Sequence, residues 1–273
     1  MSDPPNRRTY SEREALSSGK LLTTIKYFSV AEVRALLAMI QEDNKSVLTA
    51  PSLEADHKQQ TPFMSAAARG DLPIFTALLH FFDRLFSDNE KPRCWETRNG
   101  EECPQADRDA EMRTQLAMQD TAGMTLAMLA ARGENVSILK AVMAEIQHTK
   151  AALALEMRDF RGMSLLLHSA RDGSAPKFRL VLQAIELTLQ GATGIDAKEK
   201  ERSIESHLTN KCLDRKTILM LAAEAGDAMA LREVAEAVRR LCNPQRVRHL
   251  LYETDANGMN FLVHSAACAV RIP

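Results

Sequence analysis

The cysteines Cys94 and Cys103 are the nearest approach to a metal-binding pattern in this sequence. Zinc sites are built from Cys or His pairs roughly two to four residues apart, together with a second such pair. Cys94, which precedes Trp95, and Cys103 are too far apart to form one of these pairs, and no second pair follows them. We interpret them as exposed thiols of a loop and predict no metal site.

Histidines and glycines offer no better candidate for catalysis. His168 and His264 occupy equivalent places in two related segments, so we interpret them as structural or surface residues and not as a ligand pair. Gly191 and Gly194 are too sparse to hold a phosphate and are typical of a flexible loop. The P-loop, His-Glu-x-x-His and Gly-x-Ser-x-Gly motifs are absent. The sequence therefore predicts a protein that is not an enzyme and has no cofactor.

A recurring segment provides the elements that would position any site. Residues 120–131 read Asp-Thr-Ala-Gly-Met-Thr-Leu-Ala-Met-Leu-Ala-Ala, and related segments occupy 159–170 and 255–266. The helical half of the segment recurs at 61–67 and 217–223. Self-similarity on this scale is the signature of a stacked-repeat architecture.

The unit that begins near residue 56 shows how each position builds a helix pair. Thr61 can cap a helix through its hydroxyl, and Pro62 at the first helical position loses no N–H that the helix needs. Gly70 can end this helix in the left-handed conformation. Apolar residues over 72–86 then predict a second helix, so the unit is an antiparallel helix pair preceded by a turn.

An additional helix is predicted before the first complete unit. Ser29 and Glu32 have the spacing of a capping box, and Phe28 and Val33 occupy the two positions of a hydrophobic staple. No turn motif precedes this helix. We therefore interpret residues 21–55 as a degenerate N-terminal capping repeat.

Composition limits the function classes. The 273 residues are 45% hydrophobic but only 5% aromatic, which favours closely packed helices. Lys and Arg (35) nearly balance Asp and Glu (36), which argues against a nucleic-acid or membrane-surface binder. No apolar run is long enough to span a membrane, and the polar N-terminus leads into no signal core. With five cysteines, an odd number, we expect reduced thiols and an intracellular, cytoplasmic location without membrane insertion.

The units resemble ankyrin repeats, in which an Asp-x-x-Gly turn precedes Thr-Pro-Leu-His-x-Ala-Ala-x-x-Gly. The resemblance implies an all-α, ankyrin-type helix-turn-helix solenoid with short β-turn fingers. The predicted organisation is a polar segment 1–20, the capping repeat 21–55, and an array 56–273 with units starting near 56, 120, 159, 214 and 255 and insertions at 87–116 and 191–212.

The chain departs from the family pattern in three ways. The family's His is replaced by an apolar residue in every unit, so we expect an apolar seam there: Met64, Met128, Leu167, Met220 and Val263. Gly133 stands one residue early for its helix end. The fourth turn looks short, since Asp214-Arg215-Lys216 leads straight to Thr217.

Partner-binding residues are predicted from the turns and the first helices. The methionines that follow the turn glycines could form an exposed, adaptable edge or pack between neighbouring fingers. If the resemblance holds, the variable helix positions line a concave surface, where three arginines in register favour an acidic partner. The predicted residues are Arg69, Met124, Arg132, Arg161, Met163, Arg171, Arg215, Glu224, Asn257 and Met259.

The predicted function is non-catalytic protein–protein interaction, as a scaffold or adaptor that presents a concave helix face and turn tips to a protein partner, with no nucleic acid expected. Two alternatives remain open. The chain could be the targeting arm of a larger enzyme such as a kinase. A terminal repeat needs a polar outer face, whereas Phe261-Leu262-Val263 near the end are apolar. It could instead be a host-directed effector whose insertions carry the activity.

Overall fold

The computed structural model describes residues 21–27, 29–43, 55–87, 108–191 and 196–269. Within these ranges the chain is mostly helical, and its only β pairings are three isolated bridges, which confirms the all-α class. The chain divides into two compact units, residues 1–111 and 112–273. The polar segment 1–20, Phe28 of the predicted staple, and the segment with Cys94 and Cys103 lie outside the described residues.

The first unit contains helical residues 21–27 followed by α2 (Val30–Asp43), α3 (Pro62–Arg69) and α4 (Leu72–Ser87). The capping box is present: the Ser29 N–H donates to the Glu32 carboxylate at 2.8 Å, which lowers the pKa of that carboxyl. Phe63 of α3 packs edge-on against Phe75 and Phe82 of α4, with ring centroids 5.8 Å apart in both pairs. These contacts bury the face that α3 and α4 share.

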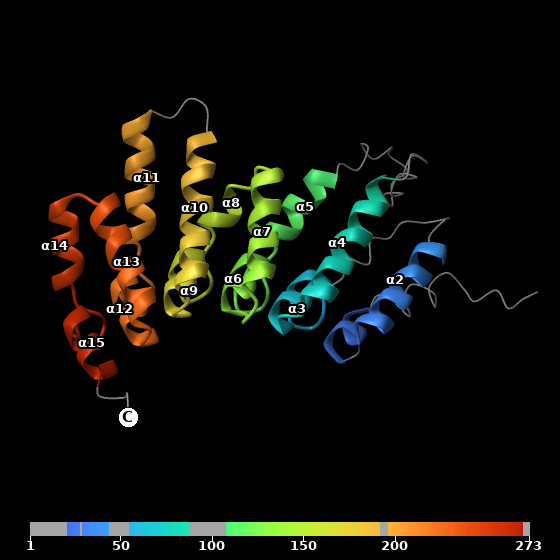
Figure 1. Ribbon diagram of the computed structural model, residues 1–273, viewed down its shortest axis with the longest axis horizontal. Coiled ribbons are helices and arrows are strands. Elements are labelled where there is room, and N and C mark those ends of the chain that lie inside the picture. Colours follow the sequence, from blue (N-terminus) through green and yellow to red (C-terminus); the bar gives the residue numbers. More distant parts are fainter. Residues whose placement is uncertain (1–20, 28, 44–54, 88–107, 192–195, 270–273) are drawn as a thin grey trace, which may run out of the picture. The chain divides into compact units, whose positions relative to one another are not determined.

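The second unit is built from short and long helices in two rows (Figure 1). The short helices are α6 (Leu126–Arg132), α9 (Leu165–Arg171), α12 (Ile218–Ala225) and α15 (Phe261–Ala269). The long helices are α7 (Val136–His148), α10 (Ala175–Gly191) and α13 (Ala228–Leu241). In one row α6 packs on α9, α9 on α12 and α12 on α15, and in the other α7 packs on α10 and α10 on α13.

Four further helices belong to the connecting segments: α5 (Arg108–Ala117), α8 (Leu153–Glu156), α11 (Ala197–Thr209) and α14 (Pro244–Tyr252). Helix α11 falls inside the predicted insertion 191–212, and α5 forms the end of the predicted insertion 87–116. Four of the five side chains from Lys198 to Arg202 are exposed on α11, so this charge run is a solvated helix face. None of the helices in the described ranges has the length and apolarity to cross a membrane.

Every short helix begins at a capping side chain. The hydroxyls of Thr61, Thr125, Ser164 and Thr217 accept the backbone N–H three residues later, and the Asn260 side chain does the same for Val263. The predicted apolar seam lies three residues into these helices. Met64, Met128, Leu167 and Met220 have no exposed surface, whereas Val263 of α15 is 46% exposed.

Gly70 ends α3 as predicted, and Gly226 ends α12 in the same way, with φ of 74° and 78°. In α9 the left-handed glycine, Gly173 with φ of 74°, stands one residue after the cap, Asp172. Gly133 differs, because its φ of −67° and ψ of 156° are extended. Its carbonyl accepts a hydrogen bond from the buried ammonium of Lys177 on α10, which also binds Asp172. Gly133 is thus held by a lysine of the next helix pair, α9 and α10.

The turns before the short helices share one bonding pattern. In four of them an aspartate Oδ1 accepts the N–H groups two and four residues later, at 2.8 or 2.9 Å: Asp56, Asp120, Asp159 and Asp255. The aspartate N–H also bonds the carbonyl four residues later, at 2.9 to 3.1 Å.

The fourth turn is not short, contrary to the sequence prediction. Its bonding begins at Cys212, whose N–H reaches the Lys216 carbonyl at 3.3 Å. Arg215 therefore occupies the glycine position, and its φ of 59° matches the left-handed backbone found there. The motif was missed because cysteine replaces the aspartate that marks the other turns. The fourth repeat of the array therefore starts near residue 212 and not near residue 214.

Successive turns of the second unit are joined through their backbones. The N–H of Phe160 donates to the Ala122 carbonyl at 3.1 Å, and the N–H of Leu213 donates to the Arg161 carbonyl at 2.8 Å. A third bond joins Ala256 to the Asp214 carbonyl at 2.9 Å. Each bond links one turn to the next, so it fixes the register between neighbouring helix pairs.

Substitution of Gly123 tests this joint. A Cβ at Gly123 would lie 2.7 Å from the Phe160 nitrogen, whereas a Cβ at Gly258 meets nothing within 4 Å, and both glycines have φ of 76°. We expect Gly123→Ala to lower the free energy of unfolding by about 2–3 kcal/mol and Gly258→Ala by about 1 kcal/mol. Urea denaturation of the two variants measures the difference. Equal losses would mean that the turns are not in close contact.

Candidate functional site

The candidate site is the face of the short helices and their turns in the second unit, where most of the predicted binding residues lie. Two of these predictions need correction. Met124 and Met163 are buried, at 3% and 2% exposure, so they form no exposed edge. Each methionine directly precedes a helix cap, and its side chain is covered by an arginine from the end of the same helix. Met259, in the last turn, is half-buried.

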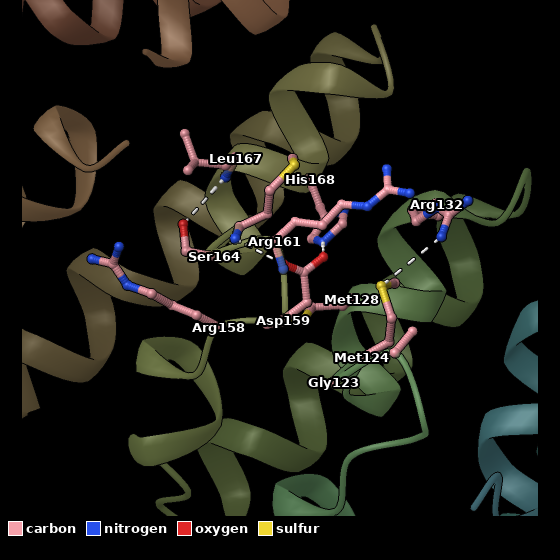
Figure 2. Close-up of polar contacts among 12 residues, drawn as sticks. Gly123, Met124, Met128, Arg132, Arg158, Asp159, Arg161, Ser164, Leu167 and His168 are labelled. Atoms are coloured by element: carbon pink, nitrogen blue, oxygen red, sulfur yellow. Dashed lines mark hydrogen bonds and ion pairs between the residues drawn. The ribbon is translucent and has the colours of Figure 1, made fainter. Parts of the chain in front are cut away.

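Arg132 and Arg171 cover these methionines, and Figure 2 shows the contact of Arg132 with Met124. Each is the last residue of its helix, α6 or α9, and each is exposed. The guanidinium Nη1 of Arg132 lies 3.9 Å from the Met124 sulfur, and that of Arg171 lies 3.8 Å from the Met163 sulfur. Two neighbouring repeats thus each present an arginine at the same position, in contact with a buried methionine.

The other two residues predicted for this row differ. Arg69 stands eight positions after its helix cap, whereas Arg132, Arg171 and Glu224 stand seven positions after theirs. The prediction of three arginines in register is therefore wrong. The Arg69 side chain donates to the Ile25 carbonyl at 2.7 Å and lies 3.8 Å from the Asp71 carboxylate.

Glu224 has the same position as Arg132 and Arg171 but carries the opposite charge. It forms an ion pair with Lys216, which replaces the turn methionine. Its carboxylate also lies 3.0 Å from Nδ1 of His264. Lys216 and Glu224 therefore substitute an ion pair for the methionine–arginine contact of the two preceding units.

His168 connects α9 to its own turn. Its Nε2 lies 3.0 Å from Oδ2 of Asp159, and both side chains are buried (Figure 2). Burial lowers the pKa of His168; the Asp159 carboxylate opposes this effect, while the charges of Arg132 and Arg171 add to it. The ring is therefore neutral near pH 7, with Nε2–H donating to the carboxylate.

His264 has the same place in α15 but different surroundings. Its Nε2 lies 3.1 Å from Asp255, as in His168, and its Nδ1 faces Glu224 on α12. For Asp255, burial raises the pKa, but the N–H groups of Met259 and Asn257 and the His264 ring together outweigh it, so the pKa is lowered. His264 is thus a side-chain link between two units, whereas His168 bonds within its own unit.

The remaining predicted residues lie on the turns. Arg161, Arg215 and Asn257 are exposed. Next to them are two apolar side chains that the sequence reasoning did not single out: Phe160 is 68% exposed and Leu213 is 73% exposed. Both immediately follow the first residue of a turn. The signal that could have found them is this fixed position, read across the repeats.

A groove of about 880 Å³ lies between α10 and α13. Four of its six charged side chains form ion pairs, and the six charges balance: Arg179 lies 2.7 Å from Glu233, and Arg240 lies 3.2 Å from Glu186. The hydrogen bond from Arg179 lowers the pKa of Glu233. This mutual neutralisation weakens the groove as a site for a small charged ligand.

Thiol and metal chemistry find little support in the described residues. Cys212 and Cys242 are buried and free, and burial raises the pKa of Cys242 to about 11, with Glu205 adding to the effect. A thiol with such a pKa is a poor nucleophile at neutral pH. No group of three or more His, Cys, Asp or Glu side chains in the described ranges is placed to hold a metal ion.

Comparison of the sequence with protein-family models and with curated proteins finds no match.

The buried histidines make stability depend on pH. Burial lowers the pKa of His168 and also of His207, which Glu156 opposes and Arg158 reinforces. The unfolded chain therefore binds protons before the folded chain does, and stability falls as the pH drops below about 6.5, the ordinary histidine value. We expect the loss in unfolding free energy between pH 7.5 and 5.5 to be smaller in His168→Gln, as measured by urea midpoints.

The matched control is His80→Gln, since His80 is exposed on α4. It should keep the full pH dependence of the natural chain. A His168→Gln variant with that same full dependence would show that His168 does not contribute.

Proposed function

We propose that the chain is an ankyrin-type repeat array that binds a protein partner without catalysis, inside the cell. The binding surface is the face of the short helices together with the turns. The first unit supplies one helix pair of this kind, α3 and α4, with the same cap and turn bonding as the pairs of the second unit.

The observation that carries this proposal is the backbone bonding between successive turns. Bonds of 3.1, 2.8 and 2.9 Å join the turns at Ala122, Arg161 and Asp214 to the turns that follow. Side chains reinforce the same edge: Gln119 donates to the Arg158 carbonyl at 2.8 Å, and Arg158 donates to the Lys211 carbonyl at 3.4 Å. A surface held in this way loses little conformational entropy on binding, which favours rigid display of side chains to a partner.

Ala131→Arg tests whether stacking and binding depend on each other. Ala131 has no exposed surface on α6, which packs on α9, so an arginine there buries a charge between helices. We expect a loss of about 3 kcal/mol or more in unfolding free energy and loss of the retained proteins in affinity capture with the chain as bait. Thermal melts followed by circular dichroism measure the first effect, and mass spectrometry of captured proteins measures the second.

The control is Ala197→Arg, which adds the same side chain at an exposed position of α11. It should melt and capture like the natural chain. If Ala131→Arg left the melt unchanged, the stacked-repeat assignment would be wrong. If the folded natural chain retained no protein above an unrelated bait, the binding function would be wrong.

A further inference from the structure

We propose that Arg132 and Arg171 form the docking site for an acidic peptide segment of the partner protein, an inference that rests on the protein-binding function proposed above. The two arginines end α6 and α9, which pack directly on each other. The two arginines therefore stand at equivalent ends of adjacent helices, where one continuous segment can reach both.

In the part of the chain that the structure describes, the positive charge of this pair has no carboxylate beside it. Among the described residues, no carboxylate oxygen lies within 4.0 Å of either guanidinium. The carboxylate of Asp159 belongs to the same region, but it is buried and already accepts the turn N–H groups and contacts His168. Since the pKa of His168 is lowered, its ring does not add a charge of its own near pH 7.

Several other basic side chains of the second unit are paired with a carboxylate within the chain. Arg179, Arg240 and Lys216 each have a glutamate partner. A cation at the last residue of a helix is stabilised by the helix dipole, which explains where Arg132 and Arg171 stand. It does not explain why these two arginines differ from those three cations in having no carboxylate partner among the described residues.

The methionine supports pre-position the two guanidinium groups. Each arginine lies over the sulfur of a buried methionine at nearly the same distance, 3.9 and 3.8 Å. In the next repeat Glu224 is paired with Lys216 and contacts His264, so the pair of arginines without carboxylate partners spans two repeats and ends there. The site has a defined width and a defined edge.

The spacing of α6 and α9 determines which peptide can bind both arginines. Packed helices lie about 8–10 Å apart, and an extended peptide advances about 3.3 Å per residue. Two carboxylates two residues apart lie on the same side of an extended segment and can therefore face the two flexible arginine side chains, and a guanidinium can bind a carboxylate through two parallel hydrogen bonds. Nucleic acid is disfavoured as an alternative, because the net charge of the whole chain is −1.

The experiment presents the full chain to a displayed library of random peptides, each about twelve residues long, enough to span both helices. Enriched peptides are then labelled, and their binding is measured by fluorescence anisotropy against Arg132→Gln/Arg171→Gln. The matched control is Arg202→Gln/Arg239→Gln, which removes two exposed arginines from α11 and α13. A second variant, Arg132→Lys/Arg171→Lys, keeps the charge, and circular dichroism melts check that each variant folds.

We expect the enriched peptides to carry two Asp or Glu residues two positions apart. Their affinity should fall by about tenfold in the glutamine variant, by less in the lysine variant, and not in the control. Addition of salt should weaken binding to the natural chain more than binding to the glutamine variant.

Three outcomes overturn the proposal. Enriched peptides without paired acids, or with equal affinity for the glutamine variant, refute the acidic docking site and leave protein binding standing. A single-stranded oligonucleotide that displaces the peptides at lower concentration than they bind assigns the arginines to nucleic acid. No enrichment of any peptide, together with no protein retained in affinity capture, refutes the docking site and the binding function alike.

Discussion

The rest of the second unit depends on the hydrogen bonds that the carboxylate of the turn aspartate accepts from the backbone. In Asp120, Asp159 and Asp255 one carboxylate oxygen accepts two N–H groups of its own turn, so the turn keeps its shape without help from a sheet. The turn then ends directly at the residue that caps the next short helix. Because the turn is rigid, its outer N–H and carbonyl groups can bond the neighbouring turns and set the register of the helices.

The fourth turn shows how much of this arrangement the backbone can hold alone. Cys212 has no carboxylate, and Arg215 adopts a left-handed φ of 59° that costs energy in any residue with a Cβ. Backbone bonds to the third turn through Leu213 and to the fifth through Asp214 persist. The neighbouring turns therefore impose a conformation that this segment's own residues do not favour.

Local chemistry was readable from the sequence, whereas contacts between units were not. Thr61, Pro62 and Gly70 each have one dominant role in a helix end, so their spacing predicted α3 correctly. The burial of Met124 depends on Arg132, eight residues away, and could not be decided from the turn alone. The spacing of nine residues that joins Asp159 to His168 recurs at Asp255 and His264 and could have revealed these pairs.

The seventh residue of the short helices varies in charge, although the caps and turns around it stay the same. Arg132, Arg171 and Glu224 stand at equivalent places on equivalent helices, yet the first two are open and the third is closed by Lys216 and His264. The caps and turns around them are the same, so these side chains can change without disturbing the stacking. Under the binding function proposed above, a reversal of charge at this one position changes the chemistry that a repeat presents to a partner. On that proposal, specificity depends on which repeats keep their charge unpaired, while the turns and caps determine only where that charge is held.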